Sequence, residues 1–129
     1  MSTPRFSRLQ LRIMQTLWQK KRAAAREITD ALNEFEPIAH STVQTLLRRL
    51  EQRGVIAHEV ENVTFIYYPL VKNDKVLKNS MQDFIDRLFG GSAQGMVSYM
   101  VKKRFLSPEE LKRLSKLTAN HTEDENKEE

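Results

Sequence analysis

A change of hydrophobic periodicity at Gly54 constrains the fold of this 129-residue chain more than any other feature. Before Gly54, apolar residues recur at helical spacing in three segments, near residues 7–20, 24–35 and 41–53. After it, residues 55–60 and 64–68 are rich in β-branched and aromatic side chains, which favour strands. Three helices followed directly by a two-stranded hairpin is the element order of a winged helix-turn-helix domain.

Local signals mark the ends of the third helix and of the hairpin. Ser41 or Thr42 can cap the start of the helix, and Gly54 suits the left-handed residue that follows its end. Asn62 tolerates the positive φ of a tight turn between the two strands. Pro69 closes the hairpin because it cannot donate to a ladder.

The first helix carries its own signals. Ser7 and Gln10 have the spacing of a capping box. The basic run Lys20-Lys21-Arg22 ends the helix, and it is either a solvated helix terminus or a phosphate contact.

Helical spacing returns after Pro69 and predicts a mainly α chain. One helix ends at Gly90-Gly91, a second covers residues near 96–101, and Ser107-Pro108 opens a third. Their large apolar side chains either pack against the winged domain or pair with a second copy. We favour a homodimer, because two-fold symmetry presents two recognition helices to half-sites about one DNA turn apart. The candidate dimerisation residues are Leu77, Met81, Phe84, Ile85, Leu88, Phe89, Met96, Val97, Met100, Leu111 and Leu114.

Charge is distributed unevenly along the chain, which has a net charge of +4 and a pI near 9.5. Residues 119–129 contain five acids and one lysine, so residues 1–118 carry +8. A basic body favours anionic partners such as nucleic acid or anionic lipid. The acidic tail lacks periodicity and is expected to be disordered. We therefore divide the chain into a DNA-binding domain (1–70), a helical dimerisation region (71–118) and a tail (119–129).

Composition excludes several classes of protein. The absence of cysteine rules out disulfides, a cysteine nucleophile and thiolate metal sites, and the three histidines are too scattered for a readable metal cluster. No glycine-rich phosphate loop, HExxH or GxSxG motif is present, so we expect neither an enzyme nor a bound cofactor. No apolar run is long enough to span a bilayer and no secretory signal is visible, which predicts a cytoplasmic location.

The outward side of the third helix suits double-stranded DNA. Its apolar residues, Val43, Leu46, Leu47 and Leu50, share one side, and the opposite side carries hydroxyls, amides and guanidiniums without an acid. Arginine can donate two hydrogen bonds to guanine, glutamine can pair with adenine, and a threonine methyl can contact the thymine methyl. We assign base readout to Ser41, Thr42, Gln44 and Thr45, phosphate contact to Arg49, and either role to Arg48.

Two further residues complete the candidate DNA-binding set, Arg26 in the second helix and Asn62 at the wing tip. The wing itself is expected to contribute weakly, because Glu59 and Glu61 repel phosphate. Polar faces of this kind also occur on ordinary solvent-exposed helices. The alternative function is therefore a winged-helix protein-interaction module with only nonspecific DNA affinity.

These segments together resemble the penicillinase-repressor family of winged-helix repressors, to which copper-responsive repressors also belong. The resemblance is carried in order, from about Arg8 to Leu117, by short motifs. They are Leu17-Trp18, Ala25-Arg26-Glu27-Ile28, the run from Thr42 to Leu50 with Gly54, Tyr67-Tyr68-Pro69-Leu70, Leu88-Phe89-Gly90-Gly91-Ser92 and Leu106-Ser107-Pro108-Glu109-Glu110.

The resemblance implies a homodimer that binds inverted-repeat operators, commonly with TACA/TGTA cores, and blocks transcription. In several relatives a sensor protease system leads to cleavage between an Asn and a Phe in the dimerisation region. The corresponding bond here is Tyr99–Met100, where both residue types differ. Copper-responsive relatives use C-terminal cysteines, so the cysteine-free sequence excludes a metal sensor of that kind.

Overall fold

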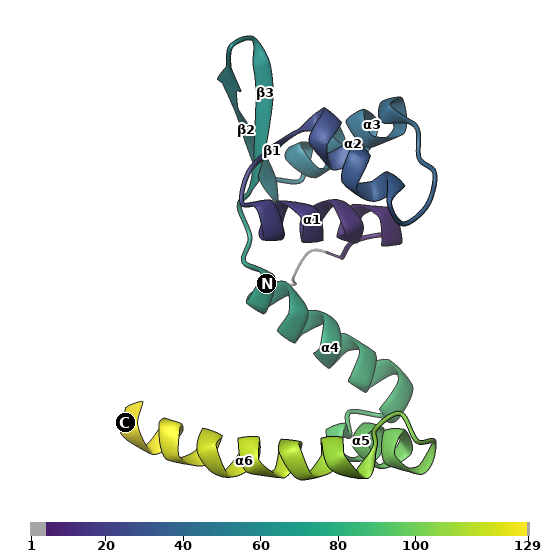
Figure 1. Ribbon diagram of the computed structural model, residues 1–129, viewed down its shortest axis with the longest axis vertical. Coiled ribbons are helices and arrows are strands. Elements are labelled where there is room, and N and C mark those ends of the chain that lie inside the picture. The colour runs from purple at the N-terminus through teal and green to yellow at the C-terminus, as the bar shows by residue number, and fades with distance from the viewer. Residues whose placement is uncertain (1–4, 129) are drawn as a thin grey trace. The chain divides into compact units, whose positions relative to one another are not determined.

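The computed structural model describes the backbone of residues 5–128 and the side chains of residues 5–120. Within this part, the chain forms six helices and a three-stranded antiparallel sheet (Figure 1). The elements are α1 (Arg8–Lys20), β1 (Ala23–Ala24), α2 (Ala25–Asn33), α3 (His40–Gln52), β2 (Ile56–Glu61), β3 (Thr64–Pro69), α4 (Asn73–Phe89), α5 (Ala93–Lys102) and α6 (Pro108–Glu128). The predicted winged helix-turn-helix followed by C-terminal helices is confirmed.

The capping box at the start of α1 forms as predicted. The Gln10 backbone N–H donates to Ser7 Oγ at 3.2 Å, and the Ser7 N–H donates to Gln10 Oε1 at 3.0 Å. These two bonds satisfy amides that otherwise lack a partner in the first turn. The helix ends at the basic run, where Lys21 has a φ of 73°.

The start of α3 corrects the prediction that Ser41 or Thr42 caps the helix. The N-cap is Ala39, and His40 already belongs to the first turn. The preceding connection decides this, because the Asn33 side chain holds both backbone groups of Ile38 at 3.1 Å. His40 Nδ1 also bonds to the Thr29 hydroxyl at 2.7 Å.

The end of α3 follows the sequence. Gly54 has a φ of 77°, as expected for the residue that terminates a helix.

The wing is a tight hairpin with an additional short strand beside it. Glu61 pairs with Thr64, so the turn consists of Asn62 and Val63, which have φ values of 49° and 59°. This geometry confirms the positive φ predicted for Asn62. The sheet order is β1-β3-β2, and the two-residue β1 was not predicted because so short a strand leaves no periodic pattern.

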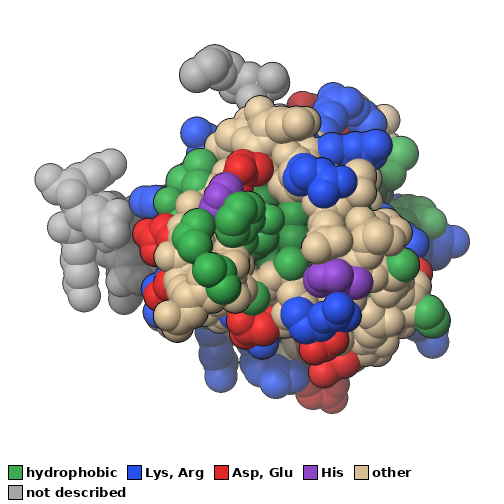
Figure 2. All heavy atoms as spheres, turned by 90° about the horizontal axis from the view of Figure 1, so that it is seen from above, with side chains coloured by type: hydrophobic (Ala, Val, Ile, Leu, Met, Phe, Trp, Pro, Cys, Tyr) green, Lys and Arg blue, Asp and Glu red, His purple; other side chains and the backbone are tan. Residues whose placement is uncertain are grey.

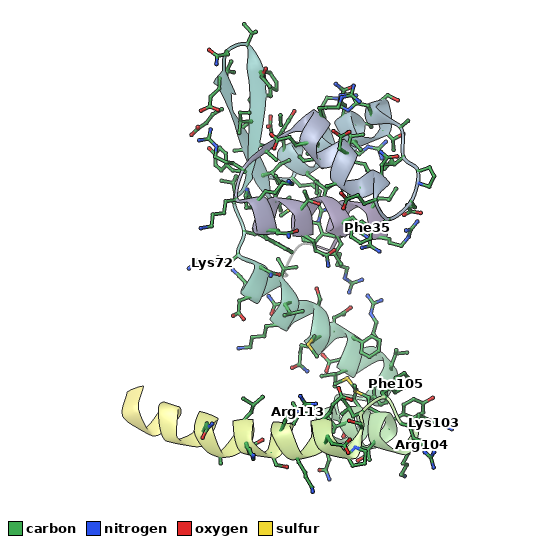
Figure 3. The ribbon with its side chains drawn as sticks, in the orientation of Figure 1. Phe35, Lys72, Lys103, Arg104, Phe105 and Arg113 are labelled. Atoms are coloured by element: carbon green, nitrogen blue, oxygen red, sulfur yellow. The ribbon has the colours of Figure 1, made fainter. Side chains whose placement is uncertain are left out.

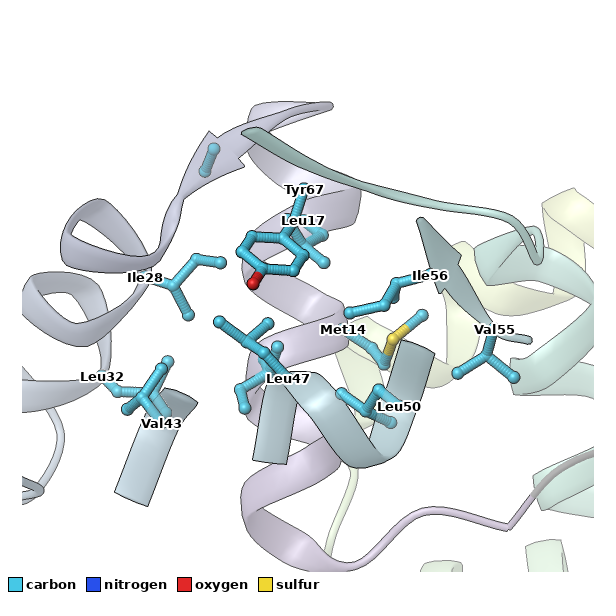
Figure 4. Close-up of a cluster of buried hydrophobic side chains, with 12 residues drawn as sticks. Met14, Leu17, Ile28, Leu32, Val43, Leu47, Leu50, Val55, Ile56 and Tyr67 are labelled. Atoms are coloured by element: carbon cyan, nitrogen blue, oxygen red, sulfur yellow. The ribbon is translucent and has the colours of Figure 1, made fainter. Parts of the chain in front are cut away.

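One hydrophobic core lies between the three N-terminal helices and the base of the sheet (Figure 4). Each helix contributes an apolar stripe, and side chains such as Leu17, Ile28 and Leu47 are fully buried there. The core consists of Ile13, Met14, Leu17, Ala23, Ile28, Leu32, Val43, Leu47, Leu50, Val55, Ile56 and Tyr67. This packing fixes which side of α3 faces outward.

The backbone contacts divide the chain into two units, Met1–Met81 and Gln82–Glu129. The division lies inside α4, whereas the sequence placed the boundary after residue 70. Residues after the wing pack within the first unit, where the Trp18 indole N–H donates to the Val71 carbonyl at 2.9 Å and Val76 is buried.

The second unit is built from helices with defined starts. Ser92 Oγ accepts the Gly95 N–H at 2.9 Å at the start of α5. At the start of α6, the Glu110 N–H donates to Ser107 Oγ at 3.1 Å, which confirms the predicted cap. Helix α6 extends to Glu128, whereas the sequence predicted a disordered tail from residue 119. Residues 119–128 contain no proline or glycine that would stop the helix.

Candidate nucleic-acid interface

The exposed side of α3 contains the residues that the sequence singled out. Val43, Leu47 and Leu50 have no exposed surface, and this burial fixes the rotation of the helix. On the other side, most of the candidates are exposed and Thr45 is partly exposed. The exposed candidates of α3 are Ser41, Thr42, Gln44, Arg48 and Arg49. This agrees with the amphipathic division predicted from helical periodicity.

Hydrogen bonds restrain the outward side chains of α3. The Thr45 hydroxyl donates to the Ser41 carbonyl at 3.0 Å, and Arg48 Nη2 donates to Thr45 Oγ1 at 3.2 Å. Ser41, Thr45 and Arg48 are therefore linked along one side of the helix. Because the Thr45 hydroxyl is engaged within the helix, its methyl group is the part best suited to contact a base.

The acidic residue at the flank of α3 is tied to the wing. Glu51 Oε1 lies 2.5 Å from Nδ1 of His58, and the His58 ring stacks on Phe65 with a centroid separation of 4.0 Å. Burial raises the pKa of the Tyr67 hydroxyl above its ordinary value, the Glu51 charge raises it further, and Arg48 opposes both effects. These contacts connect the C-terminal half of α3 to the inner side of the wing.

The wing tip is neutral and exposed. Asn62 and Val63 form the turn, and Val63 is 97% exposed. The acids behind the tip, Glu59 and Glu61, are both paired with Arg22, a contact that sequence analysis missed. Only the adjacency of β1 and β3 creates this contact, because Arg22 is 37 residues from Glu59 in the chain.

Arg26 lies on α2, which precedes the recognition helix in the helix-turn-helix, and its side chain is exposed. In such motifs the first helix crosses the DNA backbone, so this position suits a phosphate contact. Figure 2 views the molecule from the side of the wing and shows Lys and Arg side chains beside a hydrophobic patch and uncharged surface.

Many of the candidate dimerisation residues remain exposed in the single chain. The exposed residues are Leu77, Met81, Phe84, Leu88, Val97 and Leu114. Phe89, Met96, Met100 and Leu111 are partly buried, and Ile85 is buried within the chain.

A row of aromatic rings runs through the second unit. It links Phe84, Phe89, Tyr99 and Phe105, with centroid separations of 6.1 to 6.5 Å between successive rings. Phe105 lies at the turn between α5 and α6, close to Lys103 and Arg104 (Figure 3). The candidate cleavage bond, Tyr99–Met100, lies inside α5 rather than in a loop.

Similarity to known proteins identifies the family of this chain. The family profile described as "Penicillinase repressor" matches residues 6–120. The chain belongs to the penicillinase repressor family. It is therefore a DNA-binding transcriptional repressor and not an enzyme, as its sequence predicted.

Relatives of this repressor are similar over most of its length. The methicillin resistance regulatory protein MecI of Staphylococcus aureus (strain N315) is 29% identical over 79% of this chain and 83% of its own. The penicillinase repressor of Bacillus licheniformis is 25% identical over 92% of each chain. The solution structure of monomeric Bacillus licheniformis BlaI with the blaP half-operator covers 57% of this chain and 92% of its own, with 27% identity and a TM-score of 0.50.

Neither a membrane-spanning helix nor a cluster of metal ligands is present in the part of this repressor that the structure describes. None of the helices there is long and apolar enough to cross a membrane. Among the described side chains, no group of three or more His, Asp or Glu residues converges as metal ligands do.

Proposed function

We propose that this repressor is a homodimer that binds an inverted-repeat operator with sequence specificity and thereby blocks transcription. One observation carries the proposal, namely that α3 presents an exposed, acid-free polar face fixed by its fully buried opposite side. A face of this composition complements the base edges and phosphates of a major groove. The proposal places the protein in the cytoplasm, where it reaches operator DNA.

Each exposed residue has a proposed role. Gln44 pairs with adenine, and the Thr45 methyl contacts thymine. Arg48 donates to guanine or to phosphate, since its bond to Thr45 keeps it near the N-terminal half of α3. Ser41 and Thr42 also contact base edges, because the N-terminal end of a recognition helix usually enters the groove.

The remaining candidates position the protein. Arg49 and Arg26 bind phosphate, and Asn62 donates a hydrogen bond from the wing. Support comes from BlaI, of which a monomeric form was solved with the blaP half-operator. We infer that one copy of this chain likewise occupies one half-site.

The exposed apolar residues of α4 to α6 support the dimer. Leu88, Phe84 and Leu114 remain open to solvent in the single chain, and large exposed apolar surfaces commonly mark interfaces. A second copy covers them in the proposed homodimer. Joining two DNA-binding units also raises operator affinity above that of one module.

Relief of repression by a sensor protease system is proposed on the resemblance to the family. Cleavage of Tyr99–Met100 separates α6 from α4 within the dimerisation region. Because this bond lies inside α5, the helix must unwind before a protease can bind the backbone. Mass spectrometry of the repressor recovered from induced cells tests this route, and an intact chain at full derepression contradicts it.

A selection experiment tests the proposed function. Fragments of genomic DNA bound by the repressor are sequenced, and the recovered site is compared with a scrambled duplex by fluorescence anisotropy at physiological salt. We expect an inverted repeat bound at least about 10³-fold more tightly than the scrambled duplex. Equal affinity for both duplexes contradicts the proposal and favours a protein-interaction module.

A further inference from the structure

The outer face of the wing carries two carboxylates. Glu59 and Glu61 alternate along β2, so their side chains lie on the same face of the hairpin, opposite Ile66 and Thr64 of β3. Both glutamates are exposed. A hairpin with two uncompensated acids is repelled by the phosphates of DNA.

Arg22 lies between these two acids. Its Nη2 atom is 3.3 Å from Oε2 of Glu59 and 3.2 Å from Oε1 of Glu61. One guanidinium therefore bridges both carboxylates. The pairing lowers the local charge of this face from −2 to −1.

The backbone places Arg22 at this position. Lys21 has a positive φ, which turns the chain from α1 directly into β1. Ala23 then pairs with Tyr67 of β3, and its side chain is buried. The short strand β1 thus fixes the residue before it beside the hairpin that carries the acids.

Stability does not account for this contact. All three side chains are about half exposed, and ion pairs at such exposure contribute little to folding because water and salt screen them. Their main effect is on the electrostatic field of the wing, which acts on any approaching polyanion.

We propose that Arg22 is a positioning residue that masks Glu59 and Glu61 and thereby allows the wing to approach the DNA backbone. This inference rests on the proposed function, because it assumes that the wing lies close to DNA. Masking by Arg22 does not depend on the DNA sequence, because exposed carboxylates repel the phosphates of every duplex.

A charge-rescue experiment tests the proposal in the full-length chain. The variants are Arg22→Gln, Glu59→Gln with Glu61→Gln, and all three together, with binding to the selected operator and to scrambled DNA measured by fluorescence anisotropy. We expect Arg22→Gln to weaken both affinities about fivefold to tenfold at low salt, with a smaller loss as salt rises. The triple variant recovers affinity to within about twofold of the wild type.

A matched control separates masking from a general loss of positive charge. Lys20→Gln removes the same charge from α1, and the two wing substitutions should raise its affinity no more than they raise that of the wild type, whereas they should raise the affinity of Arg22→Gln several-fold more. Unchanged affinity in Arg22→Gln overturns the proposal. A loss that persists in the triple variant also overturns it, because it indicates that Arg22 binds phosphate directly.

The readouts distinguish the two proposals. The ratio of operator to scrambled affinity in the wild type tests specific repression, whereas the rescue of Arg22→Gln tests masking and appears with either duplex. Circular dichroism and thermal unfolding check that each variant folds, which is expected for substitutions at exposed positions.

Discussion

Thr45 and Arg48 show how hydrogen bonds within α3 restrain two of the side chains that we propose contact DNA. The Thr45 hydroxyl is engaged with the Ser41 carbonyl, and Arg48 donates to that same hydroxyl. Arg48 therefore has fewer conformations to lose when it binds a base or a phosphate. Arg49 is also exposed.

Residue-specific contacts predict two different kinds of binding loss. Gln44→Ala and Arg48→Ala are each expected to weaken operator binding by about 1–3 kcal/mol and to relax specificity at one base pair. Arg49→Ala is expected to weaken all duplexes similarly and to reduce the salt dependence. Anisotropy titrations against single-base operator variants measure both effects. A uniform loss for Gln44→Ala removes that residue from base readout.

The wing turn shows how an element tolerates local strain. Val63 is β-branched, yet it has a φ of 59° and is almost completely exposed. β-branched residues rarely adopt this conformation, and here no burial of the side chain compensates for it. Hairpin geometry imposes the conformation, because a two-residue turn of type I′ has positive φ at both positions, as Asn62 and Val63 do.

Replacing this valine should relieve the strain. Val63→Gly is expected to raise the free energy of unfolding by about 1 kcal/mol, as the released strain exceeds the greater entropy of the unfolded chain. Urea denaturation measures the change. Thr64→Gly is the control, because Thr64 does not have a positive φ. Glycine at this position relieves no strain and should destabilise β3. A destabilised Val63→Gly variant contradicts the proposed strain.

The start of α6 carries a pH dependence. The Ser107 backbone N–H donates to the Glu110 carboxylate, and this bond, together with the Ser107 side chain, lowers the pKa of Glu110. Because this pKa is lower in the folded state, the ionised carboxylate of Glu110 stabilises the helix start at pH values above its unfolded pKa of about 4.3. This contribution is lost as the pH falls through the lowered pKa.

A pH titration of amide chemical shifts tests this prediction. The Ser107 amide resonance is expected to titrate below pH 4.3, roughly the unfolded value for Glu, and Glu110→Gln should abolish the titration while keeping the amide acceptor. A Ser107 resonance that titrates equally in both proteins assigns the effect to another acid.

At the scale of the whole molecule, α4 joins the two units and carries exposed apolar residues. Leu77 and Met81 belong to the first unit, and Phe84 and Leu88 belong to the second. In the proposed homodimer these side chains pair with a second copy, so that assembly and operator binding depend on the same helix.

Charge placed in this apolar stripe should separate the copies. Phe84→Asp with Leu88→Asp is expected to yield monomers that retain only half-site affinity, because a buried unpaired carboxylate opposes association. Sedimentation velocity and anisotropy measure the two effects. Lys75→Glu changes the charge by the same amount at an exposed position, about 140–180° around α4 from Phe84 and Leu88 by helical periodicity, and should leave the dimer intact. Unaltered dimers in the double variant remove Phe84 and Leu88 from the interface.

The sequence by itself determined the helices of the winged domain, the wing and the apolar side of α3. Caps, turn residues and hydrophobic periodicity act over a few residues, so Ser7, Gly54 and the stripe from Val43 to Leu50 were sufficient. The same local pattern identified the exposed polar residues that we propose contact DNA.

The tertiary structure alone decided the strand β1, the start of α3 and the ion pairs of Arg22 with the wing. Each depends on residues that lie far apart in the sequence or on a connection without periodicity. Ala23 becomes a strand residue only because β3 offers it a partner, and Arg22 meets Glu59 only because of that pairing. Long-range packing, which no short window of sequence contains, therefore sets the charge of the wing that faces DNA in the proposed complex.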